Sequence, residues 1–276
     1  MVVLLLLALA YPFFEAYHLT IDHRTVEVPG LHQNLRGLRI VFVTDIHMSS
    51  RYPAWMVQDL VKTINSQSAD VVVLGGDYTD TSSDTLAFFQ SLPRIQARLG
   101  VFGVLGMHDR TAPEGNLALI VKAMTAAGVT PLVNSVSRIK VGQTYLYLSG
   151  VDDYQSGQPD TKSVAAQLRQ DDFVIFVSHS PDVLPEAIRA LGADGDNHWF
   201  DLALFGGTHG GQITLLGLPL LPSRIPDLGE RYLRGWLEEN RASIVISNGV
   251  GTEDFPVRLF APAQLHVVTL KNKTGG

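Results

Sequence analysis

Aspartate and histidine side chains gather at the ends of several apolar runs in this chain. Asp45 and His47 follow the apolar run 38–44, and residues two apart in extended chain point to the same side. Asp77 follows two glycines, which let the backbone approach closely, so its carboxylate could present oxygens to two ions. His209 lies in the glycine-rich segment 206–211. Imidazole together with carboxylate suits Mn, Fe or Zn better than Mg or Ca, so we predict a transition-metal site.

Two further histidines follow other apolar runs. His108 stands beside Asp109 after the run 101–105, and His179 follows the run 173–177. Any one such residue more often caps a helix or makes an ordinary buried hydrogen bond. Polar groups of this kind at five strand ends are hard to explain by packing alone. Because ligands of α/β sheets bind at the carboxyl ends of strands, we expect these side chains to converge on one site.

The apolar runs alternate with amphipathic segments, which is typical of layered α/β folds. Short continuous apolar runs predict buried strands, and apolar residues at helical spacing predict helices. We find no repeat and no second compact domain in the sequence, and the proline-rich stretch before Glu230 predicts a loop leading into a short helix. The predicted strands are 38–44, 71–74, 101–105, 144–148, 173–177, 202–205, 244–246 and 265–270, and the predicted helices are 54–65, 85–98, 116–127, 161–169 and 184–191.

The order of the motifs resembles the calcineurin-like metallophosphoesterases, especially their membrane-associated bacterial branch. The pattern is D-x-H, G-D-x-x-D, G-x-H-D, S-H and G-x-T-H-G-G-Q, and the resemblance runs from about Arg24 to Leu270. It implies a four-layer αββα sandwich of two mixed β-sheets, in which metal-activated water hydrolyses phosphate mono- or diesters. It also implies that His108, with Asp109, is catalytic as leaving-group acid or charge stabiliser. The implied metal ligands are Asp45, His47, Asp77, His179 and His209, with Asp77 shared between two ions.

Two positions depart from the family pattern. Met107 replaces the Asn of the family's G-N-H-D, and Gly207 replaces the first His of its G-H-T-H. Both missing side chains belong to the second metal site. A thioether is a poor ligand for a hard divalent ion, and glycine offers no side chain. We therefore predict one tight transition-metal site and a degenerate second site that retains Asp77 and His179.

The N-terminal residues 1–14 are almost wholly apolar and carry no charged side chain. A helix that is apolar on every face is typical of a membrane anchor, although fourteen helical residues cover only about 21 Å of the roughly 30 Å hydrocarbon core. No basic residue precedes the run, which disfavours a cleaved signal peptide. We therefore divide the chain into a membrane-anchor segment, residues 1–20, and a metallophosphoesterase-like domain, residues 21–276, and expect the extracytoplasmic side of a membrane.

Composition narrows the function classes. The net charge of −6, without a Lys/Arg cluster, argues against general nucleic-acid binding, and the absence of cysteine excludes disulfides and thiolate chemistry. Charged residues make up only 17% of the chain, so we expect lipid or another protein to cover part of the surface. Two functions remain. One is a membrane-associated phosphoesterase acting on a small phosphate ester or a lipid head group. The other is a weak or inactive accessory subunit, a pseudoenzyme, of a membrane-protein complex.

Overall fold

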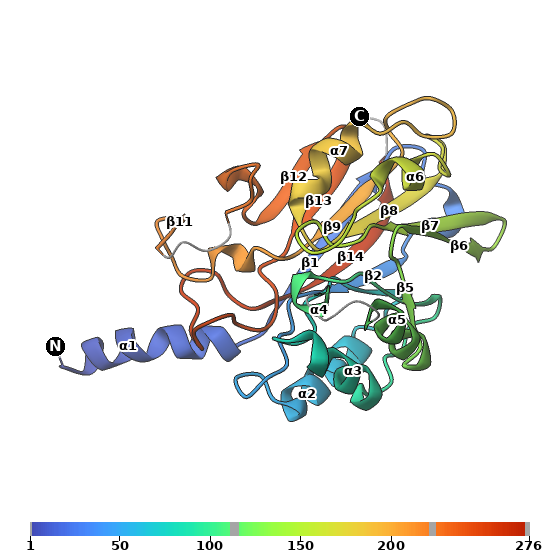
Figure 1. Cartoon of the computed structure of the whole chain (residues 1–276). Coiled ribbons are helices and arrows are strands. Elements are labelled where there is room, and N and C mark those ends of the chain that lie inside the picture. Colours follow the sequence, from blue (N-terminus) through green and yellow to red (C-terminus); the bar gives the residue numbers. More distant parts are fainter. Residues whose placement is uncertain (1, 111–115, 221–224, 274–276) are drawn as a thin grey trace.

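The computed structural model of the chain describes residues 2–110, 116–220 and 225–273. Met1 of the predicted anchor and the last three residues of the predicted domain therefore lie outside the described part. Two six-stranded sheets form the centre of the fold (Figure 1). The first has the order β1 (Thr20–Val28), β14 (Gln264–Asn272), β2 (Arg39–Val43), β3 (Val71–Leu74), β4 (Gly100–Gly103) and β5 (Val129–Pro131). The second has the order β12 (Gly235–Glu239), β13 (Ala242–Ile246), β9 (Leu202–Phe205), β8 (Phe173–Ser178), β7 (Thr144–Gly150) and β6 (Ser135–Val141).

Both sheets are mixed. In the first, β2, β3, β4 and β5 run parallel to one another, and β14 is antiparallel to β2. In the second, β7, β8, β9 and β13 are parallel, whereas the edge strands β6 and β12 are antiparallel to their neighbours. The carboxyl ends of the parallel strands therefore gather along one edge of each sheet, where the sequence predicts the site.

Helices cover the outer face of each sheet, so the fold has four layers (Figure 1). Alternate residues of β2 show how the layers arise: Ile40 and Phe42 pack between the two sheets, whereas Val41 and Val43 pack with the helices outside the first sheet. The predicted αββα sandwich is confirmed. The first sheet is covered by α2 (Ala54–Ser66), α3 (Ser82–Ser91) and α5 (Asn116–Ala126), and the second by α6 (Thr161–Ala165) and α7 (Leu184–Arg189).

Some element boundaries differ from the prediction. The predicted helix 85–98 is α3, which ends at Ser91. The cause is Pro93, because the residue before a proline avoids helical backbone. The strands β1, β5, β6 and β12 of the two large sheets were not predicted. The predicted short helix after the proline-rich stretch is a single 3-10 turn, η4 (Glu230–Tyr232), and the small hairpin of β10 (Thr214–Leu215) and β11 (Leu218–Pro219) precedes it.

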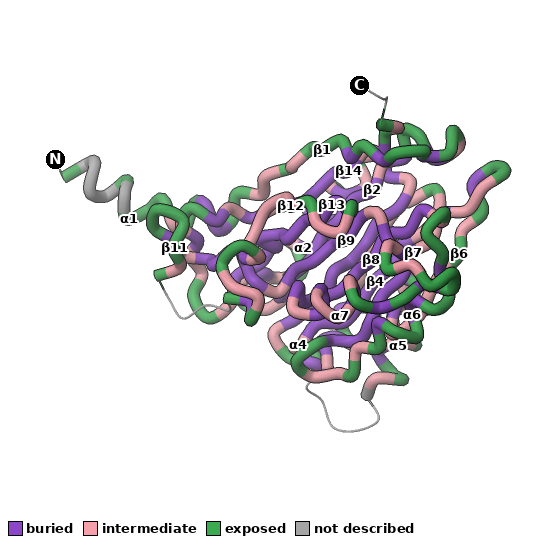
Figure 2. The backbone as a smooth tube through the Cα atoms, turned by 90° about the horizontal axis from the view of Figure 1, so that it is seen from above, coloured by how far each residue is buried: buried purple, intermediate pink, exposed green. Residues whose placement is uncertain are grey.

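The N-terminal helix α1 (Val2–Tyr17) projects from the body of the protein (Figure 1). Its inner end is attached to the loop before β14: Arg258 N donates to Pro12 O at 2.9 Å, and Phe260 N donates to Glu15 Oε2 at 3.0 Å. Most of the described residues of this helix are exposed, as the green parts of the tube in Figure 2 show. Among the described residues, no helix is both long and apolar enough to cross a membrane.

Candidate metal centre

The site lies where the parallel strands of both sheets end. Asp45 follows β2, Asp77 follows β3 and His108 lies in the short helix α4 (Met107–Arg110) after β4. His179 and His209 follow β8 and β9 of the opposite sheet. The structure thus brings the predicted ligands from two sheets into one cluster, as the motif order led us to expect.

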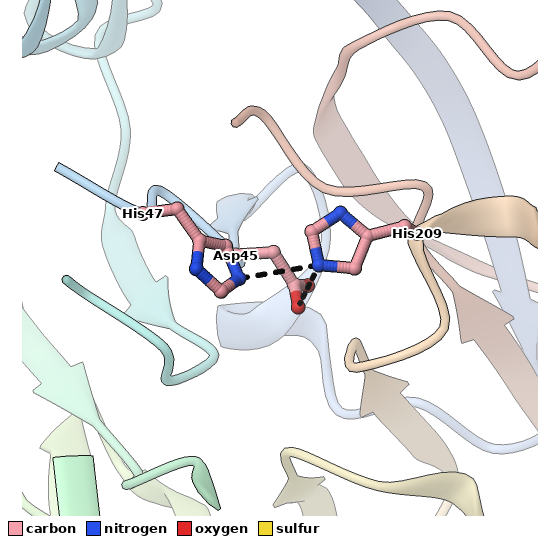
Figure 3. A group of neighbouring side chains, drawn as sticks. All are labelled: Asp45, His47 and His209. Carbon is pink, nitrogen blue, oxygen red and sulfur yellow. Dashed lines mark hydrogen bonds and ion pairs between the residues drawn. The ribbon is translucent and has the colours of Figure 1, made fainter. Parts of the chain in front are cut away.

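Three ligand atoms converge at the first predicted ion (Figure 3). Atoms of Asp45, His47 and His209 all lie within 4.8 Å of one another. His209 Nε2 is 3.2 Å from His47 Nε2 and 3.5 Å from Asp45 Oδ1. Asp77 Oδ2 lies 3.6 Å from His47 Nε2. Two imidazole nitrogens and carboxylate oxygens that face one point fit a divalent transition metal.

Neighbouring groups fix the orientation of these ligands. His47 Nδ1 lies 3.0 Å from Asp80 Oδ1, which leaves Nε2 for the site. Arg51 in turn donates to Asp80 Oδ2 at 2.6 Å. His179 Nδ1 is 2.8 Å from the carbonyl oxygen of Gly75, so its Nε2 also faces inward. Such second contacts set the tautomer and orientation of metal-binding histidines. Asp80 is the last residue of G-D-x-x-D, but we had given it no role.

The backbone of the ligands is unusual. Asp45, His47, Asp77 and His209 all adopt positive φ, at 53°, 48°, 51° and 51°. Few residues other than glycine do so, and such conformations concentrate at functional sites. Contrary to our prediction, Asp45 and His47 therefore do not point the same way through extended backbone. They converge through this left-handed backbone, in a loop bonded to the loop after β3: Asp45 N donates to Gly76 O at 3.0 Å and His47 N donates to Asp77 O at 3.1 Å.

Asp77 joins the two halves of the site. Its Oδ2 lies 3.2 Å from His179 Nε2 and 2.8 Å from His108 Nδ1, and its Oδ1 accepts from the His108 N–H at 2.9 Å. Burial opposes ionisation of Asp77, but His179, with His108 and His47, holds its pKa well below the ordinary value. Burial likewise opposes protonation of His179, yet Asp77 and Asp45 raise its pKa well above the ordinary value. The carboxylates thus create a field that favours a bound cation.

Met107 and Gly207 lie close together beside His179. Met107, His179 and Gly207 line a common pocket of about 300 Å³, together with Asp153 and Tyr154. Met107 and Gly207, where we predict departures from the family pattern, therefore lie beside His179.

Asp109 does not share the position of His108. Its carboxylate accepts from the N–H groups of Asp77 at 2.8 Å, Tyr78 at 3.1 Å and Gly106 at 2.9 Å, and from Thr85 Oγ1 at 3.1 Å. Burial, and then the charge of Asp77, raises its pKa to about 7. We predicted a catalytic residue, but these contacts are those of a residue that positions the loops carrying Asp77 and His108.

Two residues of the C-terminal loop, Glu253 and Arg258, also contact the site but were not predicted as site residues. Glu253 Oε1 lies 3.5 Å from His108 Nε2, and Glu253 Oε2 lies 3.9 Å from His209 Nε2. The buried Arg258 donates to the carbonyl oxygens of Asn248 at 2.8 Å, Ala261 at 2.9 Å and His209 at 3.3 Å. Both residues belong to the conspicuous segment N-G-V-G-T-E-D-F-P-V-R, which was the available signal.

The chain is similar to known phosphoesterases. A family model described as calcineurin-like phosphoesterase matches residues 38–211. The chain is similar to the phosphodiesterase YaeI of Escherichia coli, with 31% identity over 225 residues that cover 79% of this chain and 77% of that protein. It is similar to the metallophosphoesterase YkuE of Bacillus subtilis, with 26% identity over 94% of this chain and 88% of that protein. The solved structure of the phosphopantetheinyl hydrolase PptH of Mycobacterium tuberculosis is similar with a TM-score of 0.46 and 10% identity, covering 81% of this chain and 96% of that one. The chain belongs to the calcineurin-like phosphoesterase family.

Proposed function

We propose that the protein hydrolyses phosphate esters with one tightly held divalent transition metal, Mn, Fe or Zn. The observation that carries the proposal is the convergence of Asp45, His47 and His209 within 4.8 Å, with Asp77 beside them. A bound metal supplies Lewis acidity, which activates water and offsets charge that develops at phosphorus. The low pKa of Asp77 keeps its carboxylate ionised for this purpose.

His108 is the group that would handle the leaving-group proton. Its backbone N–H and its Nδ1 both face the carboxylate of Asp77, which fixes the ring. Its Nε2 points toward Glu253. This nitrogen is the atom that would donate a proton to the departing oxygen. Asp109 supports this arrangement by accepting the Gly106 and Asp77 N–H groups.

The second ion site is degenerate in this proposal. Asp77 and His179 remain, but Met107 and Gly207 supply no suitable ligand. We infer that a second ion binds weakly and needs the substrate phosphate as a further ligand. The same two substitutions favour the second candidate function, a weak or inactive accessory subunit of a membrane-protein complex.

Hydrolysis of bis(p-nitrophenyl) phosphate and p-nitrophenyl phosphate, with and without manganese, decides between the two functions. The enzyme proposal expects metal-dependent turnover of at least one ester, which Asp45→Asn abolishes. Asp59→Asn is a matched control, because Asp59 lies on the surface of α2 and pairs there with Lys62. Turnover that Asp45→Asn leaves unchanged, or no turnover of any phosphate ester, would refute the enzyme and favour the accessory subunit.

We further propose that α1 inserts into one leaflet of a membrane. Its sixteen residues span about 24 Å, and one leaflet of the hydrocarbon core is about 15 Å thick. Val2, Leu7, Leu9, Phe13 and Phe14 are exposed along it. At its base lie exposed aromatic residues of the kind found at membrane interfaces: Tyr11, Tyr17, Trp55 and Phe260. A site attached to a membrane in this way could act on small phosphate esters or on lipid head groups.

Vesicle flotation tests this attachment. The full chain should float with phosphatidylcholine vesicles, and a variant that lacks residues 2–14 should stay in the soluble fraction. Leu9→Glu should weaken flotation, whereas Leu191→Glu, at an exposed position just after α7, should not. A full chain that remains soluble and monomeric beside vesicles would contradict the anchor.

A further inference from the structure

Glu253 places a third carboxylate at the metal centre. Its two oxygens face different histidines, since Oε1 is 3.5 Å from His108 Nε2 and Oε2 is 3.9 Å from His209 Nε2. His209 is a predicted metal ligand and His108 is the predicted partner of the phosphate. The side chain of Glu253 is 22% exposed, so it lies at the solvent side of the cluster, where a substrate must arrive.

The position of Glu253 is built into the fold. Gln212 Oε1 accepts from the Glu253 N–H at 2.9 Å, and Gln212 Nε2 donates to the Glu253 carbonyl at 2.8 Å. The same amide nitrogen donates to Phe255 O at 3.1 Å. Gln212 is the last residue of the motif that carries His209. These hydrogen bonds attach the loop of Glu253 to the loop of His209. The backbone contacts therefore hold the Glu253 carboxylate near the site.

We propose that Glu253 makes the site selective for phosphodiester monoanions over phosphomonoester dianions. The proposal rests on the phosphoesterase function proposed above. A phosphate oxygen that pairs with His108 Nε2 comes within a few ångströms of the Glu253 carboxylate, because that carboxylate already faces the same nitrogen. Repulsion from a carboxylate grows with the charge of the ligand.

The charges of the two ester classes differ at the working pH. The second pKa of a phosphomonoester is about 6, so at pH 8 it carries close to two negative charges, whereas a diester carries one. A degenerate second ion site removes positive charge that would otherwise favour the dianion. Both features of this chain, the additional carboxylate and the weakened ion site, therefore act against monoesters in the same direction.

The test is Glu253→Gln, which removes the charge and keeps the shape and the backbone contacts with Gln212. The ratio of kcat/KM for bis(p-nitrophenyl) phosphate to that for p-nitrophenyl phosphate should fall by about tenfold, mainly because the monoester improves. Asp254→Asn is the matched control. It removes the same charge one residue further along, at an exposed position where Arg51 donates to the backbone carbonyl and not to the carboxylate.

A binding measurement separates this proposal from the proposed activity. Calorimetry at pH 8 with the manganese-loaded protein should show that Glu253→Gln tightens inorganic phosphate about tenfold and dimethyl phosphate much less. Equal changes for both anions, no change, or the same change in Asp254→Asn would overturn the selectivity proposal. If the parent hydrolyses no ester, the proposed function fails, but the two binding affinities still decide the role of Glu253.

Discussion

A Cβ atom on Gly207 would lie 3.1 Å from Nε2 of His179, the atom that faces Asp77. Gly207 has a φ of +75°, a backbone conformation that side chains with a Cβ seldom adopt. The glycine therefore lets the backbone pass close to His179, and a side chain introduced there would press against this ring, which would have to shift by a few tenths of an ångström.

The first prediction concerns Met107 and Gly207, which line one pocket with His179. Met107→Asn together with Gly207→His should restore binding of a second metal ion and raise phosphodiesterase activity well above the parent. Each change alone leaves the ion one ligand short, so the two effects should be strongly non-additive. The positive φ at Gly207 should cost about 1–2 kcal/mol in stability.

Turnover of bis(p-nitrophenyl) phosphate with manganese by the parent, both single variants and the double variant checks this prediction. Gly207→Ala is the control, because it introduces the backbone strain without a ligand. A double variant that folds and binds two ions but stays as slow as the parent would place the defect elsewhere. A parent that already turns over like a good two-metal enzyme would show that the second site is intact.

The second prediction concerns metal content. The purified protein loaded with manganese should retain about one ion per chain after gel filtration, because Asp45, His47 and His209 form a group of candidate ligands and Asp77 lies beside His47. His209→Ala should lose this ion. Elemental analysis measures both, with Asp59→Asn as the surface control. Two retained ions in the parent, or none, would contradict the prediction.

The general fold could be predicted because each central strand has a recognisable pattern in its own stretch of sequence. β3 and β8 are buried along their whole length, so they appear in the sequence as continuous apolar runs. β6 and β12 could not be found in this way. They are edge strands with several exposed or half-buried residues, and they form because a neighbouring strand supplies hydrogen bonds, which no local pattern records.

Only the site residues that belong to sequence motifs could be predicted. Asp45 and His47 could be named from D-x-H, but the positive φ values that direct them into the site are imposed by contacts with Gly76 and Asp77. Glu253 lies far along the chain from His108. Only the packing of the C-terminal loop on the loop of His209 brings it there, so spacing in the sequence gives no indication of the contact.

The third prediction concerns Arg258, which is fully buried and lies behind the site. Arg258→Met should lower the free energy of unfolding by about 3–5 kcal/mol, because several buried carbonyl oxygens lose their donor. The change should also weaken metal binding, since one of these carbonyls belongs to His209. Chemical denaturation and metal titration measure the two effects. Arg241→Met, at an exposed position, is the control, and a loss equal to that of the control would contradict the structural role.

The fourth prediction is a pH dependence of stability that arises away from the site. Asp201 precedes β9, and its Oδ2 accepts from Val174 N at 3.0 Å. Burial, and then the charge of Asp172, raises its pKa to about 7. The unfolded chain gives an aspartate a pKa of about 3.9, so between these values the folded state binds more protons than the unfolded state.

The contribution of Asp201 to the free energy of unfolding is therefore fully present below about pH 4, and it is lost as the pH rises through about 7. Asp201→Asn keeps an oxygen for Val174 N but cannot ionise, so relative to the parent the variant should gain on the order of 2–4 kcal/mol between pH 5 and pH 8. Urea unfolding of both proteins at the two pH values measures this difference. The pKa of Asp109 is also raised to about 7, but Asp109 is present in both proteins, so its contribution to the pH dependence cancels in the difference. Asp171→Asn, an exposed neighbour, should show the pH dependence of the parent. If Asp201→Asn does so too, the carboxyl of Asp201 is already ionised in the folded protein at pH 5.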